Sequence, residues 1–242
     1  MEDQFTRTRL LLGDDSIDIL MHSHVAVFGI GGVGGYVCEA LARSGVGAFD
    51  LVDSDTVSLT NLNRQIIATV DTVGRPKTQV MKERMRSINP GVNVKTWDCF
   101  FLPENADSFP FETYDYVIDA VDTVTAKIEL VLRSQQYKVP VISAMGAGNR
   151  LDPSGFLVSD LFETEGCPLA RVMRRELRKR GVEKLKVVYS KEEPVKPKET
   201  SFPSLPEEGS RKHSVPGSNA WAPAAAGLCI AAEVVRDLTG AW

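Results

Sequence analysis

Cysteines are few in this sequence, and they are widely separated. Four occur in 242 residues, and no two of them stand in a C-x-x-C pair: Cys38, Cys99, Cys167 and Cys229. This spacing argues against a disulfide framework and against a zinc knuckle.

Long apolar runs are also lacking, because the longest, 220–232, contains a proline and is too short to cross a bilayer. The first residues, MEDQFTRTRL, are charged and do not resemble a signal peptide, so we expect a cytoplasmic protein.

A strong excess of either charge is missing as well. The chain has 28 Lys and Arg against 32 Asp and Glu, which gives a formal net charge of −4 and a pI near 5.5. The surface as a whole therefore does not attract nucleic acid, and any site for a polyanion must be local. Because 43% of the residues are hydrophobic, the chain can bury the core of one large α/β domain.

Short apolar runs alternate with amphipathic segments over the first 150 residues. The apolar runs predict buried strands at 24–30, 48–53, 92–97, 114–121 and 139–144. The amphipathic segments predict helices at 14–23, 34–44, 76–88 and 125–137. Strand and helix in this rhythm predict an α/β, Rossmann-like fold with a doubly wound, mostly parallel sheet.

After Gly146 the regular alternation of apolar runs and amphipathic segments ends. The pattern there predicts a C-terminal extension of the same fold. Strands are expected at 156–160 and 184–190, and helices at 168–180 and 224–238. Between them, 192–218 is rich in Pro, Ser, Lys and Glu, which predicts an extended or mobile loop.

The first predicted strand leads directly into a glycine-rich turn. Gly29, Gly31 and Gly34 fit the pattern G-x-G-x-x-G, with Gly32 as a further glycine, and a predicted helix follows. Glycines allow the backbone to approach a phosphate, and a helix N-terminus favours anions. Asp53 lies 19 residues after Gly34 at the end of the next strand, where a carboxylate binds ribose hydroxyls. The pattern indicates a nucleotide site, and it does not by itself distinguish NAD from ATP.

A polar loop follows Asp53, where an NAD-binding unit would continue into a helix. The stretch SDTVSLTNLNRQ holds Asp55, Asn61, Asn63, Arg64 and Gln65. A second cation, Lys77, stands at the start of the next predicted helix. Asp119 and Asp122 lie in VIDAVD, at the carboxyl end of the strand predicted at 114–121. In isolation, Lys77 reads as a solvated side chain and Asp119 as a structural carboxylate.

The combination of these groups favours a different chemistry from hydride transfer. The carboxyl ends of parallel strands meet at one edge, so we expect Asp53, Arg64, Lys77 and Asp122 to converge on one nucleotide. Two cations match the charge that grows on a leaving pyrophosphate, and a carboxylate is a suitable ligand for Mg²⁺. Hydride transfer needs neither.

Four motifs in order resemble the ubiquitin-activating-enzyme superfamily, which includes ThiF-type bacterial adenylyltransferases that activate sulfur-carrier proteins. They are VFGIGGVGGYVCEALARSGVG, LVDSDTVSLTNLNRQ, VGRPKTQVMKERMRSINP and VIDAVDTVTAK. Within that superfamily the chain is most similar to the tRNA threonylcarbamoyladenosine dehydratases. The stretches that carry this similarity are TNLNRQ, GAGNRLDPSGFLVSDL and CPLARVMRRELRKRGV.

The resemblance implies a single adenylating domain over 1–242, with a nucleotide-binding core at 1–150. Residues 151–242 would then serve tRNA binding and dimerisation. It implies that Mg-ATP activates the carboxylate of threonylcarbamoyladenosine in tRNA, and that the side chain then cyclises with net loss of water. It leaves a monovalent cation open as a further cofactor.

The family's motifs also assign roles to individual residues of this sequence. Asp53 would bind ribose, Arg64 and Lys77 the phosphates, and Asn61 would orient the triphosphate. Asp122 would hold the metal, and we expect Asp55 and Gln65 to line the same site. Arg7, with Arg9 as a second candidate, matches an arginine that reaches the nucleotide of the partner in a homodimer.

The helix predicted at 168–180 carries a basic stripe. Its arginines are spaced at i, i+3, i+4 and i+7, which predicts one helix face: Arg171, Arg174, Arg175 and Arg178. From Arg171 to Lys198 there are 11 Lys and Arg against 4 Asp and Glu. The stripe suits contact with an RNA backbone, and the alternative is an ordinary solvated face.

Two other functions stay open from the sequence. One is an activator of a ubiquitin-like or sulfur-carrier protein, which could also bring a desulfurase partner. In that case Cys167 would be the candidate thiol, although nothing near it marks a tuned nucleophile. The other is an NAD-binding oxidoreductase or a non-catalytic nucleotide-binding module, in which the Arg64 and Lys77 pair has no role.

Overall fold

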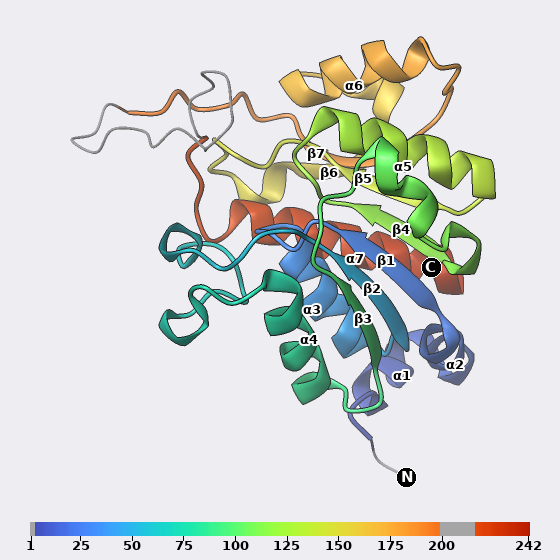
Figure 1. Ribbon diagram of the computed structural model, residues 1–242. Helices are drawn as coiled ribbons and strands as arrows, with labels where there is room; N and C mark the ends of the chain where they lie inside the picture. The colour runs from blue at the N-terminus through green and yellow to red at the C-terminus, as the bar shows by residue number, and fades with distance from the viewer. Residues whose placement is uncertain (1–2, 199–215) are drawn as a thin grey trace.

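The computed structural model describes residues 3–198 and 216–242 (Figure 1). Seven strands form one sheet in the order β3-β2-β1-β4-β5-β7-β6. Their bounds are β1 His24–Phe28, β2 Ala48–Val52, β3 Asn93–Trp97, β4 Tyr116–Asp119, β5 Val141–Ala144, β6 Phe156–Asp160 and β7 Lys186–Ser190. All neighbouring pairs are parallel except β6 with β7, which is antiparallel. The predicted doubly wound, mostly parallel sheet is therefore confirmed.

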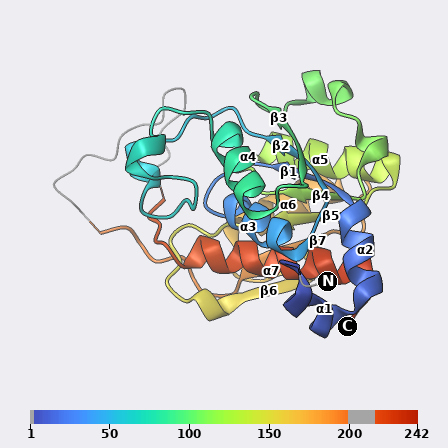
Figure 2. The same ribbon diagram turned by 90° about the horizontal axis from the view of Figure 1, so that it is seen from below.

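Helices cover both faces of this sheet (Figure 2). Their bounds are α1 Thr6–Leu12, α2 Asp14–His22, α3 Gly34–Ser44, α4 Lys77–Ile88, α5 Val124–Tyr137, α6 Pro168–Arg178 and α7 Ala222–Thr239. Helices α3, α4 and α7 pack on one face, and α5 and α6 pack on the other. Short 3₁₀ turns occur in the connections, among them η1 Leu59–Asn61 and η2 Val70–Thr72. No described helix has both the length and the apolar character that a membrane span requires.

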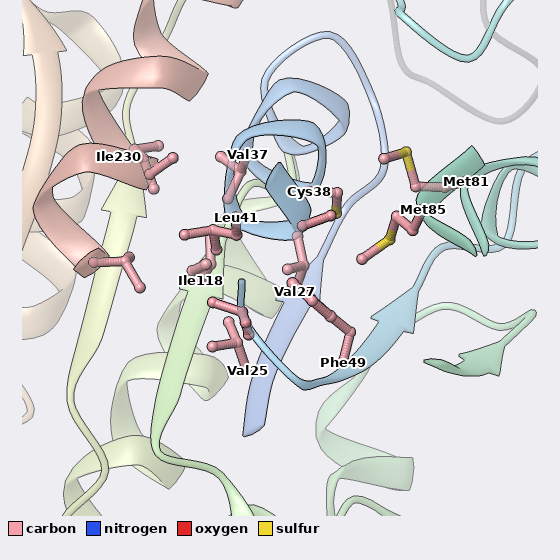
Figure 3. Close-up of a cluster of buried hydrophobic side chains, with 14 of the residues drawn as sticks. Val25, Val27, Val37, Cys38, Leu41, Phe49, Met81, Met85, Ile118 and Ile230 are labelled. Atoms are coloured by element: carbon pink, nitrogen blue, oxygen red, sulfur yellow. The ribbon is translucent and has the colours of Figure 1, made fainter. Parts of the chain in front are cut away.

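The largest apolar cluster lies between the sheet and the layer of α3, α4 and α7 (Figure 3). Val25 and Val27 of β1 and Ile118 of β4 contribute their side chains from the sheet, and Leu41 of α3 and Ile230 of α7 contribute theirs from the helices. All five are fully buried. Burying an aliphatic side chain of this size contributes roughly 1.5–3 kcal/mol, so this layer fixes α3 and α7 against the strands whose ends form the site.

The observed elements differ from the predicted ones mainly at their ends. The strand predicted at 24–30 ends at Phe28, because Gly29 has a φ of 91° and turns the chain. Helix α4 begins at Lys77 and not at Pro76, which caps it from outside. Helix α1 was not predicted at all. Of the loop predicted at 192–218, residues 199–215 lie outside the described part of the chain.

Asp119 belongs to the interior of the sheet and not to the nucleotide site. Its carboxylate is fully buried, lies 3.1 Å from Nζ of Lys127, and also accepts a hydrogen bond from Ser143. Lys127 donates further to the carbonyl of Ala144 at 2.7 Å. Burial raises the pKa of Asp119, and the neighbouring ammonium of Lys127 opposes this shift. The alternative interpretation of Asp119 as a structural carboxylate fits these contacts.

Candidate nucleotide site

The glycine turn joins β1 to α3 at the carboxyl edge of the sheet. The N–H of Gly29 donates to the carbonyl of Val52 at 2.8 Å, which ties the turn to the end of β2. A Cβ at Gly29 would lie 2.6 Å from the carbonyl oxygen of Ala120, and a Cβ at Gly34 would lie 1.8 Å from that of Gly29. Glycine is therefore required at both positions by the backbone itself. The amides of Gly35 and Tyr36 donate to the carbonyls of Gly31 and Val33, and the N-terminus of α3 as a whole favours an anion.

Replacing Gly34 by alanine is expected to destabilise the protein by about 1–3 kcal/mol, because the new methyl group displaces the backbone of the turn. Gly31→Ala is the matched control, since a Cβ there meets nothing nearer than Nε2 of Gln65 at 3.9 Å. Urea unfolding of both variants measures the difference. Equal stability of the two variants would contradict the geometry of the turn.

Asp53 is held at the end of β2 by the backbone around it. Its Oδ2 accepts from the N–H of Ile30 at 2.6 Å, and its Oδ1 accepts from the N–H of Asp55 at 2.9 Å. Burial raises the pKa of Asp53, while the charge of Lys77 and the two amide donors oppose this shift. The carboxylate is thus fixed beside the glycine turn, in the position that a ribose-binding residue needs.

Lys77 is not the solvated surface lysine of the alternative interpretation. Its side chain is buried, and Nζ lies 2.6 Å from Oδ2 of Asp55 and 4.0 Å from Oδ1 of Asp53. The backbone helps to place it, because the N–H of Lys77 donates to the carbonyl of Asp55 at 3.0 Å. A buried ammonium at the N-terminus of α4 therefore lies next to the nucleotide-binding turn.

Arg64 lies against the same turn from the polar loop. Its Nη1 donates to the carbonyl of Thr60 at 2.8 Å and to Oδ1 of Asn63 at 3.0 Å. Its Cγ is 3.6 Å from the position that a Cβ of Gly32 would take. Within the described part of the chain no carboxylate pairs with this half-buried guanidinium, and burial lowers its pKa. The charge of Arg64 is available to a ligand.

Asn61 and Gln65 lie in the same loop and are both buried. Oδ1 of Asn61 already accepts from the N–H of Ser58 at 3.0 Å and caps the turn η1, so only its amide group could contact a triphosphate. Oε1 of Gln65 has no partner among the described residues, although buried acceptors are normally satisfied. Together with the closeness of Gln65 to Gly31, this indicates that a ligand completes the site.

Asp122 lies two residues after Ala120, whose carbonyl oxygen would be 2.6 Å from a Cβ at Gly29, whereas Arg7 lies away from this cluster. Asp122 is exposed just beyond β4, and in the described ranges its carboxylate accepts from the hydroxyl of Thr123 at 3.3 Å and from no other side chain. Arg7 is exposed on α1, at the opposite end of the sheet, where Phe5 packs beside Gly45. The role of Arg7 in the site of a partner stays a prediction. Arg9 pairs with Asp3 at 3.3 Å and with Asp14 at 3.0 Å.

The basic helix α6 differs in part from its predicted form. Arg174 does not face solvent: it is half-buried and donates to the carbonyl of Thr164 at 2.7 Å. The acid Glu176 binds Arg175 at 2.9 Å as well as the cations that follow it, so the stripe is not free of acids. Arg171 and Arg178 remain exposed. A concavity of about 450 Å³ follows the helix, lined by Arg171, Arg174, Arg175, Arg178 and Lys179.

Cys167 is buried under α6 and packs in the apolar cluster on that face of the sheet. A thiol in this position is inaccessible to a carrier protein in this conformation.

Sequence reasoning missed a segment that joins the site to the C-terminal helix. Asn63 donates to the carbonyl of Ser218 at 3.1 Å, and Pro223 of α7 lies against Gly32. Asn219 donates to the carbonyl of Arg150 at 2.6 Å. Arg150 itself is buried, and two of its side-chain nitrogens have no partner among the described residues. Two signals for Arg150 were present in the sequence: it follows the end of β5 by six residues, and it belongs to the stretch GAGNRLDPSGFLVSDL.

The sheet, the glycine turn and the charged groups at its carboxyl edge define a nucleotide-binding α/β domain. The model of the ThiF family matches residues 5–241, and the chain belongs to this family.

Individual members of the family are similar to this chain to different degrees. The chain is 41% identical over 242 residues to the tRNA threonylcarbamoyladenosine dehydratase of Bacillus subtilis, an alignment that covers 98% of this chain and 95% of that protein. It is similar to crystal structures of the E. coli tRNA N6-threonylcarbamoyladenosine dehydratase, TcdA, in complex with AMP and with ATP. Their TM-scores are 0.88 and 0.86 at 35% and 34% identity, and both comparisons cover 98% of this chain and 94% of the other. A sulfur carrier protein adenylyltransferase of Thermus thermophilus is 35% identical over 122 residues, which is half of this chain.

Proposed function

We propose that this protein is an ATP-dependent tRNA threonylcarbamoyladenosine dehydratase. The observation that carries the proposal is the pair of cations, Lys77 and Arg64, beside the glycine turn and Asp53. It is supported by the relatives of that name, which align with nearly the whole chain. The buried position of Cys167 gives no support to the alternative, a carrier-protein activator that works through this thiol.

In the proposed reaction the carboxylate of the substrate attacks the α-phosphorus of ATP, and the bond to the leaving pyrophosphate breaks. The glycine turn and Asp53 position the nucleotide, and Lys77 and Arg64 stabilise the charge that develops on the phosphates. A hydroxyl or nitrogen of the same substrate then attacks the acyl carbon, and AMP leaves with one of the former carboxylate oxygens. The substrate has lost one water, and no enzyme thiol is required.

The proposal includes Mg²⁺ and a monovalent cation as cofactors. It also includes a homodimer in the cytoplasm. Asp122 would hold Mg²⁺, which fits a metal bound mostly by phosphates and by one carboxylate. Residues 3–198 and 216–242 contain no cluster of three or more potential metal ligands, so the phosphates would have to supply the remaining contacts. Bound Mg²⁺ neutralises phosphate charge. In the homodimer, Arg7 of one protomer would reach the nucleotide of the other.

The proposal is tested with tRNA that carries threonylcarbamoyladenosine. Mass analysis of the nucleosides after incubation with ATP should show the loss of one water, accompanied by AMP and pyrophosphate. A sulfur-carrier protein with a Gly-Gly tail serves as the competing substrate. Pyrophosphate release with the carrier and not with the tRNA would contradict the proposal and favour the carrier-protein activator.

We further propose that the exposed part of the basic stripe binds the tRNA backbone. Helix α6 begins near the carboxyl edge of the sheet, because Gly166 lies against the carbonyl of Lys191, just after β7. The double variant Arg171→Glu, Arg178→Glu should weaken tRNA binding about tenfold or more at low salt and reduce the salt dependence of the affinity. Arg86→Glu, an exposed arginine on the other face of the sheet, is the control. Equal affinity of the double variant and the control would show that α6 does not bind tRNA.

A further inference from the structure

Arg150 is a buried cation outside the set of residues that we assign to the nucleotide. Its side chain is 2% exposed and is among the largest fully buried ones in the protein. Nε and Nη1 have no hydrogen-bond partner among the described residues. A guanidinium stays charged at physiological pH, and burying it without a partner costs free energy. An anion that binds Arg150 would remove this cost.

The chain places Arg150 at the same edge of the sheet as the glycine turn. It follows β5, whose neighbour β4 pairs with β1, the strand that leads into the turn. The carbonyl of Arg150 accepts from Asn219 at 2.6 Å, and the adjacent Ser218 accepts from Asn63 at 3.1 Å. Residues 218–219 therefore join Arg150 to the loop that carries Arg64.

We infer that Arg150 binds the carboxylate of the substrate, the group that attacks ATP, and this inference rests on the proposed function. In the sheet order, Asp53 at the end of β2 lies on one side of the glycine turn, and the ends of β4 and β5 lie on the other. A nucleotide with its ribose at Asp53 and its phosphates at the turn leaves the β5 side to the second substrate. Arg150 is a buried cation on that side, and the other one, Lys127, is paired with Asp119 in the described part of the chain.

Charge balance supports the same assignment. The reaction brings a carboxylate up to a triphosphate, and these anions repel each other unless each has its own cation. Arg64 and Lys77 are assigned to the phosphates, and Lys77 also pairs with the exposed Asp55 at 2.6 Å. The charge of Lys127 is compensated by the fully buried Asp119 at 3.1 Å. Among the described residues no carboxylate pairs with Arg150, whose Nε and Nη1 have no partner there, and the planar fork of a guanidinium matches the two oxygens of a carboxylate.

The experiment compares two probes, the nucleoside N6-threonylcarbamoyladenosine and its methyl ester, in the presence of a non-hydrolysable ATP analogue. The wild-type protein should bind the acid about 10- to 100-fold more tightly than the ester, because the ester lacks the charge. Arg150→Met should bind both equally, and its affinity for the ATP analogue should not change. Equal binding of the two probes to the wild type would overturn the inference without any variant.

A second measurement separates substrate binding from a structural role. Without ligands, Arg150→Met should melt at the same temperature as the wild type or above it, because an unpaired buried charge is removed. Arg150→Lys, which keeps the charge without the fork, should retain part of the preference for the acid. A lower melting temperature of Arg150→Met would show that Arg150 pairs within the chain, and weaker binding of the ATP analogue would show that it contacts phosphate. Either result overturns the inference.

These outcomes are distinct from a failure of the proposed function. If the wild type does not dehydrate modified tRNA, the proposed function and the inference fall together. If the wild type does so and Arg150→Met is equally active, only the inference falls.

Discussion

Lys77→Met is expected to lower the rate of pyrophosphate release by about 10²- to 10³-fold, the usual effect of losing one preorganised charged donor. Methionine has nearly the shape of the buried lysine stem without its charge. The carboxylates of Asp53 and Asp55 would then lie beside the triphosphate without the ammonium that now lies between 2.6 and 4.0 Å from them. The rate is measured in single turnover with saturating ATP.

Lys82→Met on the same helix is the matched control, because Lys82 is only half-buried and lies one and a half turns farther along α4. Its rate should equal that of the wild type. Near-normal turnover of Lys77→Met, in a protein that still folds, would show that Lys77 does not act on the phosphates.

Arg64→Ala is expected to lower the same rate by about 10²-fold. Among the described residues the guanidinium donates to a backbone carbonyl and to the amide oxygen of Asn63 and forms no ion pair, so its removal should leave the fold intact. The loss should therefore appear in ATP affinity and turnover and not in the melting temperature.

Arg75→Ala tests whether any nearby positive charge would have the same effect. Arg75 lies two residues before Lys77, and its guanidinium is paired with Glu83. This variant should be nearly as active as the wild type. If it lost as much activity as Arg64→Ala, the effect of Arg64 would be general electrostatics and not contact with the nucleotide.

The parallel sheet could be predicted from the sequence because its central strands, β1, β2, β4 and β5, are buried on both faces. After His24 the strand at 24–28 is entirely apolar, and the glycine turn marks where it ends. Helix α1 could not be predicted in this way. None of its side chains is fully buried, Leu10 and Leu11 are 82% and 86% exposed, and its seven residues are too few to show a helical apolar period.

Some residues of the candidate site could likewise be predicted from local patterns and sheet topology, and others could not. Asp53 and Lys77 could be placed together because both lie next to the ends of neighbouring elements, where the topology of a parallel sheet brings residues together. The half-buried position of the Arg174 side chain could not be predicted, because it donates to the backbone carbonyl of Thr164 in a preceding loop. The burial of Arg150 depends on the return of the chain at 216–219, a contact between segments about 70 residues apart that local patterns do not encode.

The position at which ATP is cleaved tests the central claim most directly. The substrate is prepared with oxygen-18 in the carboxylate of its threonylcarbamoyl group, and the products of one turnover are analysed by mass spectrometry. Attack on the α-phosphorus predicts AMP that carries one oxygen-18 atom and unlabelled pyrophosphate. Label in inorganic phosphate, with ADP as the nucleotide product, would mean attack on the γ-phosphorus and would contradict this account.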